Sequence, residues 1–427
     1  MASSGASEDP AERGPGAAAA ESAVSAAERG PFRLLGQGRV VEDGTHQRLM
    51  AAEGVLCQGV AGALALRYRI TATAVGEGPA GTATRNHLVE DSEGRRWFVK
   101  VYPDGTDLAA EEQALALAEY ARHADVPVPA VLRTADDAGL VATAEGLSLS
   151  VSAWVEDAET AEGGLFGDRW TAVGETMGRL HHALARHPAG PPRPVPARQV
   201  CDVARAERRL RRLLRRWAPA PAESEFTRWA RRTAARRLDA LPEVAALLEP
   251  LPHELTAQVV HGDLASPNLL MRQQEVAAVI DFRPPGHRSA AWELGRILLD
   301  PRTVLARPNE WITGLATALS AYRAANPALP LDDLLAVPRV AAGNLACSVY
   351  PLSEPLDRPG AVTPSLEAYG RARHQAATVL RERLDEAEET LHALLTPGDG
   401  SGRRPTGPRG HPARRLPRPT GTDGGSG

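Results

Sequence analysis

Four polar residues in the segment VVHGDLASPNLLMRQQEVAAVIDF (259–282) have the types and spacing that phosphoryl transfer requires. They are His261, Asp263, Asn268 and Asp281. The amide oxygen of Asn268 and the carboxylate of Asp281 suit a hard cation such as Mg²⁺, which takes oxygen ligands and usually keeps substrate phosphates in its shell. Asp263 supplies a carboxylate that can act as a general base toward a substrate hydroxyl.

A β-hairpin is expected to position these side chains. Residues 269–271 and 276–280 predict two short buried strands with a polar turn between them. If the strands pair symmetrically about residues 274–275, Asn268 and Asp281 stand opposite each other, about 5 Å apart at Cα. Each Asp or Asn taken alone is better explained as a turn cap, but the whole set on one hairpin favours a reactive site.

HGDLASPN followed by VIDF resembles the catalytic segment of the aminoglycoside phosphotransferase and choline kinase superfamily, whose members are relatives of protein kinases. The resemblance implies that Asp263 is the catalytic base, that Asn268 and Asp281 bind the metal, and that His261 supports the loop. It extends over about residues 68–395. The implied fold is of the α/β (α+β) class: a protein-kinase-like two-lobed fold with a small N-terminal antiparallel-sheet lobe and a larger, mainly helical C-terminal lobe.

A single lysine, Lys100, stands among 49 Lys and Arg residues, so every other basic residue is arginine. It ends the strand-like segment RRWFVKVY, where the lysine of a kinase contacts the α- and β-phosphates of ATP. A compact ammonium does this better than the broad guanidinium of arginine. The survival of this one lysine therefore favours a phosphate-binding role, although chance is the alternative.

Residues 76–81 read GEGPAG and fit the pattern GxGxxG, with Gly76, Gly78 and Gly81 as its glycines. Strand-like segments at 68–75 and 84–90 flank them, so no helix follows as it would in a dinucleotide-binding site. Glycines let backbone N–H groups approach phosphates closely. An ordinary glycine-rich hairpin is the common alternative, and the order strand, glycine loop, strand, Lys100 strand matches a kinase small lobe.

Asp107 is a candidate N-cap for a helix that runs to about residue 123. A carboxylate on this helix is expected to pair with Lys100, as in kinases. The spacing does not separate Glu111 from Glu112; Glu112 is preferred narrowly, and a solvated charge pair is the alternative. After the alternating strand 147–155, backbone groups around Trp154 and Val155 are expected to meet adenine, unless the tryptophan only packs between lobes.

The remaining chain to residue 395 predicts mostly helices, at about 170–185, 203–217, 224–240, 309–325, 333–350 and 363–395. His181 is expected to be structural, and the arginines of the second and third of these helices to form a solvated face. Glu293 stands where the family often has an Asp that anchors the catalytic loop. Polycationic aminoglycosides require a carboxylate-rich pocket, for which the candidates in this arginine-rich lobe are Asp332, Asp333, Glu354 and Asp357.

Composition places few constraints beyond the class of protein. The chain has 427 residues, is 43% hydrophobic and carries a formal charge of −4, which gives no indication of nucleic acid or membrane partners. Three widely spaced cysteines fit a reducing cytoplasm. The predicted division is a disordered tail over 1–30, a nucleotide-binding lobe over 31–155, a catalytic and substrate lobe over 156–395, and a disordered basic tail over 396–427.

These patterns predict a small-molecule kinase that transfers the γ-phosphoryl group of ATP, or less favourably GTP, to a hydroxyl of a metabolite or antibiotic with the help of Mg²⁺. A monomer or homodimer is expected. A non-catalytic nucleotide-binding module is the main alternative, and a metal-dependent phosphoesterase that uses the same Asp and Asn residues is a more distant one. The sequence leaves the acceptor unidentified.

Overall fold

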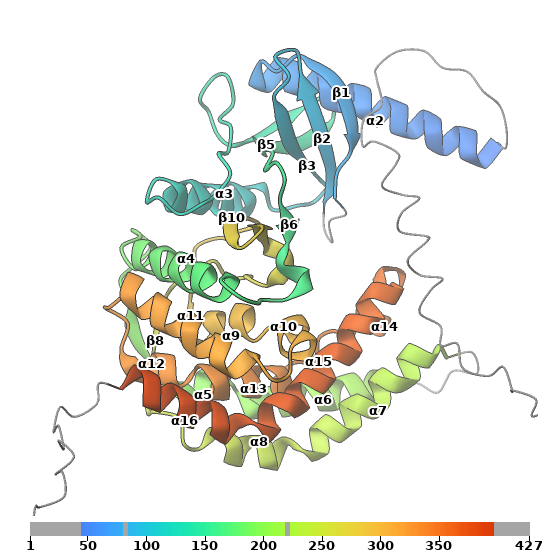
Figure 1. Ribbon diagram of the computed structural model, residues 1–427. Helices are drawn as coiled ribbons and strands as arrows, with labels where there is room; N and C mark the ends of the chain where they lie inside the picture. Colours follow the sequence, from blue (N-terminus) through green and yellow to red (C-terminus); the bar gives the residue numbers. More distant parts are fainter. Residues whose placement is uncertain (1–43, 80–83, 218–222, 397–427) are drawn as a thin grey trace, which may run out of the picture.

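The computed structural model describes residues 44–79, 84–217 and 223–396, with side chains from residue 54 onward. The chain folds into a small lobe built on an antiparallel sheet and a larger, mainly helical lobe (Figure 1). Residues 154–158 lead from the last strand of the small lobe toward the large lobe. This arrangement is the predicted two-lobed α/β fold. The predicted tails, 1–30 and 396–427, lie outside the described residues apart from Thr396.

The small-lobe sheet has five antiparallel strands in the order β1-β2-β3-β5-β4. β-branched residues alternate along these strands, so that Val75, Val89, Val99 and Val151 are buried. Lys100 therefore projects from the face of the sheet opposite to Val99. The strands are β1 (Ala72–Glu77), β2 (Arg85–Asp91), β3 (Arg96–Tyr102), β4 (Val141–Ala144) and β5 (Leu147–Ala153).

A helix that precedes the first strand covers this sheet. Helix α2 (Gly44–Tyr68) buries Val60, Ala63 and Leu64 in the small-lobe core. Its last residue, Tyr68, donates its hydroxyl hydrogen to the carbonyl oxygens of Leu140 and Leu149, at 2.9 and 3.2 Å. The strand predicted for 68–75 is therefore wrong at its start, because Tyr68 completes the helix and β1 begins only at residue 72.

Helix α3 (Leu108–Arg122) connects the two lobes. As predicted, Asp107 is its N-cap: its carboxylate accepts the backbone N–H of Ala110 at 3.1 Å. The apolar face of α3 contributes Leu117, Ala118 and Ala121 to the core of the large lobe rather than to that of the small lobe. The sheet carrying Lys100 and the helices below it are thus joined by packing as well as by the chain.

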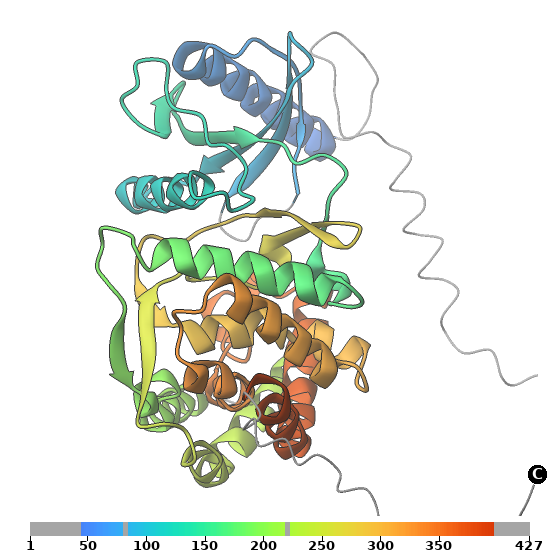
Figure 2. The same ribbon diagram turned by 60° about the vertical axis from the view of Figure 1, so that its left-hand side comes forward.

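The predicted hairpin forms a three-stranded sheet, in the order β10-β9-β6, between the small-lobe sheet and helix α4 (Figures 1 and 2). Its strands are β6 (Glu159–Thr160), β9 (Leu269–Arg272) and β10 (Glu275–Val279). The predicted register is wrong: Arg272 pairs with Glu275, and a bulge at Ala277 then shifts the pairing by one residue. Ile280 therefore donates its N–H to the carbonyl of Asn268 at 3.0 Å, and Asp281 lies one residue beyond that pair.

Helices α4 and α11 form the centre of the large lobe and approach each other closely. A Cβ on Gly174 of α4 would stand 2.1 Å from the carbonyl oxygen of Ala318 on α11, so only glycine allows this contact. Below them lie the other large-lobe helices and a small sheet of order β11-β8-β7 (Figure 2). The predicted helix 363–395 divides into two at Arg383. None of the described helices is long and apolar enough to span a membrane.

The elements of the large lobe, besides β6, β9 and β10, have the following bounds: η1 (Ala161–Gly163), α4 (Arg169–Leu184), β7 (Arg193–Pro196), α5 (Ala197–Val200), α6 (Val203–Arg216), α7 (Glu225–Asp239), α8 (Leu241–Leu248), β8 (Glu254–Val259), η2 (Ser266–Asn268), β11 (His287–Ser289), α9 (Ala290–Leu298), α10 (Pro301–Ala306), α11 (Trp311–Ala325), α12 (Leu331–Leu335), α13 (Val337–Cys347), α14 (Glu354–Asp357), η3 (Pro359–Ala361), α15 (Pro364–Glu382) and α16 (Leu384–Leu395).

Candidate active site

The catalytic loop, residues 261–268, runs between β8 and β9 and is held from below by helix α9. The fully buried carboxylate of Glu293 accepts the backbone N–H of His261 at 3.0 Å and that of Gly262 at 2.7 Å. Gly262 has φ of +90°, a left-handed conformation that only glycine adopts without strain. The longer Glu293 thus anchors the loop as the shorter Asp does in the resembling family.

Two histidines complete this buried network. His181 contacts Glu293 through Nε2 at 3.1 Å and the Tyr322 hydroxyl through Nδ1 at 3.0 Å, in the structural role predicted for it. His261 donates Nε2–H to the carbonyl of Ile280 at 2.8 Å, which ties the catalytic loop to the end of the hairpin. Burial lowers the pKa of the His261 imidazole, so the ring is neutral at pH 7 and serves as a fixed hydrogen-bonding spacer.

The side-chain amide of Asn268 uses its nitrogen in a hydrogen bond within the loop, which leaves its oxygen available to a ligand. Its Nδ2 donates to the backbone carbonyl of Asp263 at 3.0 Å. The amide oxygen is not used in this bond, and the Asn268 backbone carbonyl pairs with Ile280, the residue before Asp281. One amide oxygen and one carboxylate in this position form a donor set that fits a hard divalent cation.

Lys100 reaches from the small lobe to Asp281 and forms an ion pair with its carboxylate. Burial alone would raise the pKa of the Asp281 carboxyl, but the Lys100 ammonium outweighs this effect and holds the pKa below its ordinary value. The Asp281 side chain is 50% exposed, so the pair is open to solvent and to a ligand. Asp281 itself has φ of +66°, which turns its side chain out of the strand direction.

The beginning of the glycine segment lies level with Lys100 on the sheet. Gly78 donates its N–H to the carbonyl of Asn86 at 2.9 Å, and Asn86 is the cross-strand partner of Lys100. A Cβ on Gly78 would stand 3.0 Å from the backbone of Asn86, so the close approach requires glycine. Gly76 belongs to strand β1 and is buried, while Gly81 lies outside the described residues.

The structure does not bring Glu112 to Lys100. The Glu112 carboxylate accepts the backbone N–H groups of Leu140, at 2.7 Å, and of Val141, at 2.8 Å. It therefore orders the start of β4, and the predicted pairing with Lys100 is replaced by the pair with Asp281. Glu111, the other candidate of the sequence, makes no ion pair with a described residue. The sequence around the start of this helix does not show that the backbone of β4 competes for the Glu112 carboxylate.

The linker that was expected to meet adenine is partly used by the sheet. Trp154 donates its backbone N–H to the carbonyl of Arg96 at 3.1 Å, so this N–H is not free for a ligand. Its ring centroid lies 6.4 Å from that of Phe98 on β3, so this contact is within the small lobe and differs from the interlobe packing named as the alternative. Within the described residues the backbone N–H of Val155 has no hydrogen-bond partner, so it is available to a ligand.

Sequence patterns missed one residue that contacts the predicted base. Arg296 of α9 donates from one terminal nitrogen to Asp263 Oδ1 at 2.7 Å, and its Nε donates to the carbonyl of Leu264 at 3.2 Å. The indole of Trp292 lies beneath the guanidinium, whose central carbon is 5.0 Å from the ring centroid. Nothing in the sequence separates Arg296 from the many other arginines, so only the fold reveals this contact.

The profile of the phosphotransferase enzyme family matches residues 76–331, which is more than half of the chain and includes all of the site described above. The chain belongs to this phosphotransferase family. No curated protein sequence matches it. Among solved structures, an AMP-bound spectinomycin phosphotransferase superposes with a TM-score of 0.51 at 13% identity, covering 79% of this chain and 98% of that chain.

Two further solved structures of this fold lie at similar sequence distance from this phosphotransferase-family chain. An amicoumacin kinase in complex with AMP-PNP and Ca²⁺ gives a TM-score of 0.48 at 18% identity and covers 78% of this chain and 96% of that chain. A macrolide 2′-phosphotransferase type I gives 0.45 at 18% identity, covering 79% and 99%. At these identities the likeness concerns the two-lobed fold and leaves the substrate open.

Proposed function

We propose that this phosphotransferase-family chain transfers the γ-phosphoryl group of ATP to a hydroxyl group of a small molecule. The observation that carries the proposal is the set of contacts that brings Lys100, Asp281, Asn268 and Asp263 together from three separate segments. Lys100 pairs with Asp281, Asn268 bonds to the backbone of Asp263, and His261 ties their loop to the residue before Asp281. A neutral His261 and a saturated Glu293 fix the backbone on which three of these side chains stand. Phosphoryl transfer depends chiefly on such positioning.

Each residue has a distinct part in the proposed reaction. Lys100 and the glycines of the GxGxxG pattern, Gly76, Gly78 and Gly81, are assigned to the phosphates of the nucleotide, and Val155 to its adenine. Asn268 and Asp281 would hold Mg²⁺, which when bound neutralises charge that develops on the phosphate oxygens. Lys100, which pairs with Asp281 in the structure, would contact the phosphates from the side of this carboxylate.

Asp263 orients the acceptor and receives its proton. The acceptor oxygen forms a bond to the γ-phosphorus, the bond from that phosphorus to the β–γ bridging oxygen breaks, and ADP leaves. The hydroxyl proton goes to Asp263, whose Oδ1 is held by Arg296 and whose Oδ2 remains available. Arg296 in this arrangement is a positioning residue that fixes the rotamer of the base.

A direct test incubates the full-length protein with ATP, Mg²⁺ and a panel of hydroxyl compounds and detects phosphorylated products by mass spectrometry. We expect products that carry one added phosphoryl group, in amounts that match the ADP formed, and no product when EDTA removes the cation. Nucleotide binding without transfer to any acceptor would instead support a non-catalytic module. Hydrolysis of phosphate esters in the absence of nucleotide would support a phosphoesterase.

A further inference from the structure

The indole ring of Trp292 on α9 lies against two arginines. The central guanidinium carbons of Arg296 and Arg288 are 5.0 and 5.1 Å from its ring centroid, within the range of a cation–π interaction. Arg296 stands one helical turn further along α9, whereas Arg288 reaches the ring from β11. The indole Nε1–H donates to Asn344 Oδ1 on α13 at 3.2 Å. The ring is therefore fixed by contacts to β11, to α13 and to the next turn of its own helix.

The guanidinium of Arg296 joins this ring to the predicted base. Its Nε donates to the carbonyl of Leu264 at 3.2 Å, and one terminal nitrogen donates to Asp263 Oδ1 at 2.7 Å. A guanidinium is planar, and its N–H donors point in directions fixed by that plane. The surface of the Trp292 ring thus limits the orientations that Arg296 can take, and through them the position of the Asp263 carboxylate.

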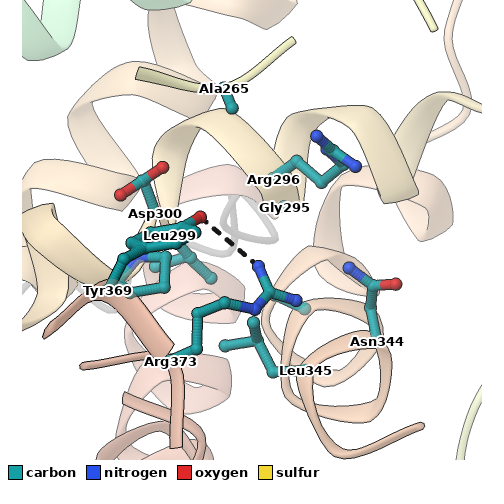
Figure 3. Close-up of a pocket in the computed structure, with 11 residues that line it drawn as sticks. Ala265, Gly295, Arg296, Leu299, Asp300, Asn344, Leu345, Tyr369 and Arg373 are labelled. Atoms are coloured by element: carbon teal, nitrogen blue, oxygen red, sulfur yellow. Dashed lines mark hydrogen bonds between the residues drawn. The ribbon is translucent and has the colours of Figure 1, made fainter. Parts of the chain in front are cut away.

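A second carboxylate competes for the same guanidinium. Asp300 follows Arg296 by four residues, and both line a small hollow beside the catalytic loop (Figure 3). Asp300 is buried, and it accepts the backbone N–H of Arg302 at 2.9 Å and that of Ser266 at 3.5 Å. A buried carboxylate attracts a nearby guanidinium, yet Arg296 donates to Asp263 and not to Asp300. A further contact must therefore favour the observed orientation of Arg296.

We propose that Trp292 is a positioning residue for phosphoryl transfer, which keeps Arg296 on one oxygen of Asp263 and away from Asp300; this inference rests on the proposed function. With Oδ1 held, Oδ2 of Asp263 stays available for the proton of the acceptor hydroxyl. Without the ring, Arg296 is free to cover both oxygens or to turn to Asp300, and the base loses its orientation. A misplacement of about 1 Å in such a group can reduce turnover about 100-fold.

Two substitutions at Trp292 separate the aromatic ring from simple packing. Trp292→Leu keeps an apolar side chain and removes the ring, whereas Trp292→Phe keeps a ring and loses only the hydrogen bond to Asn344. Turnover is measured with the full-length protein, ATP, Mg²⁺ and the hydroxyl compound that gives the most product in the panel. We expect kcat to fall about 10- to 100-fold in Trp292→Leu and about threefold or less in Trp292→Phe, while KM for ATP changes less than about threefold. An unchanged kcat in Trp292→Leu, or equal losses in both variants, would overturn the inference.

A double-mutant cycle shows whether the ring acts through Arg296. Arg296→Met removes the guanidinium and keeps a side chain of similar length. If Trp292 only orients Arg296, Trp292→Leu should lower kcat by less than about twofold further once Arg296 is replaced by methionine. Losses that multiply in the double variant would show that Trp292 acts independently of Arg296 and would contradict the proposed role.

The matched control is Trp229→Leu on α7. Trp229 is also partly buried and lies under a guanidinium, that of Arg371, whose central carbon is 5.1 Å from the ring centroid. Neither residue contacts the catalytic loop in the structure, so Trp229→Leu should keep the kcat of the wild type. A loss in this control as large as that in Trp292→Leu would mean that removal of any such ring disturbs the lobe, and it would overturn the inference.

Hydrogen exchange of the Arg296 Nε–H tests the hold of the ring without any acceptor. NMR of the full-length protein follows this signal, which is identified by its absence in Arg296→Met. We expect exchange to be at least about tenfold faster in Trp292→Leu and unchanged in Trp292→Phe and Trp229→Leu. This result in a protein that phosphorylates no compound of the panel would overturn the proposed function and support the hold of Trp292 on Arg296. Equal exchange rates in the wild type and in Trp292→Leu would overturn the inference.

Discussion

The catalytic loop lies beside a small hollow lined by α9, α13 and α15 (Figure 3), yet the charged groups of the two regions are bonded in opposite ways. In the loop, both oxygens of the buried Glu293 carboxylate accept protein N–H groups. In the hollow, Arg373 has a single long bond to a neutral hydroxyl and a buried nitrogen with no acceptor. A saturated network fixes geometry, whereas a cation with one long bond is less constrained. The frame of the site is the network around Glu293, and its binding surface is the region where the side chains of Lys100 and Asp281 are open to solvent.

Removing the anchor of the frame should have the largest effect on stability. Glu293→Ala leaves the N–H groups of His261 and Gly262 buried without an acceptor, and we expect unfolding to become easier by about 3–5 kcal/mol. Chemical denaturation measures this change. Glu310→Ala is the control, because Glu310 forms an exposed pair with Arg307 and should change stability by less than about 0.5 kcal/mol. Equal effects of the two variants would contradict the assigned role of Glu293.

A second test of the frame changes the backbone of the catalytic loop at Gly262. Gly262→Ala forces a side chain onto φ of +90° and places its Cβ 3.0 Å from the Cβ of Arg283. We expect a loss of about 1–3 kcal/mol, with reduced turnover because the base shifts with the loop. Gly286→Ala is the matched control, since its nearest contact is at 3.7 Å and its φ is not positive. A thermal melt that is the same for both variants would show that the loop tolerates strain.

On the binding surface, changes should alter function more than stability. Lys100→Arg keeps the charge and an exposed pair with Asp281, so stability should stay within about 1 kcal/mol. ATP affinity or turnover should fall about tenfold, because a planar guanidinium cannot take the place of a compact ammonium between phosphates. Nucleotide titration and initial rates measure these effects. Full activity in this variant would show that the single lysine has no special role.

Arg373→Met should have the smallest effect on stability and gives the sharpest contrast with Glu293. Replacing an unpaired, partly buried cation by an apolar side chain of similar length should leave the free energy of unfolding unchanged or raise it by up to about 1 kcal/mol. Differential scanning calorimetry beside Glu293→Ala measures the contrast. A decrease in the free energy of unfolding of more than about 2 kcal/mol would show that Arg373 belongs to the frame that stabilises the lobe.

Much of this arrangement can be predicted from the sequence because several signals are local. The Lys100 strand, the Asp107 cap and the hairpin each follow from spacing and turn chemistry, and the structure has the corresponding elements. The HGDLASPN motif, which contains Asp263, also predicts the loop that precedes the hairpin. The assignment of roles to these site residues stays a prediction.

Other features depend on three-dimensional packing. The bulge at Ala277 changes the register without changing the composition of the strand. The Glu112 carboxylate accepts backbone N–H groups at the start of β4. This strand is too short to be recognised from its sequence pattern. Arg296 and Arg373 carry no spacing signal in a chain where nearly every basic residue is arginine. Their importance follows only from what lies within reach of each guanidinium.

The central claim is that Asp263 acts as the base of a phosphotransferase whose nucleotide site is built separately. Parallel measurement of turnover and ATP affinity in the wild type and in Asp263→Ala tests it most directly. Turnover should fall by roughly 10²–10⁴ while the Kd for ATP changes less than about threefold. Turnover equal to that of the wild type would contradict the claim.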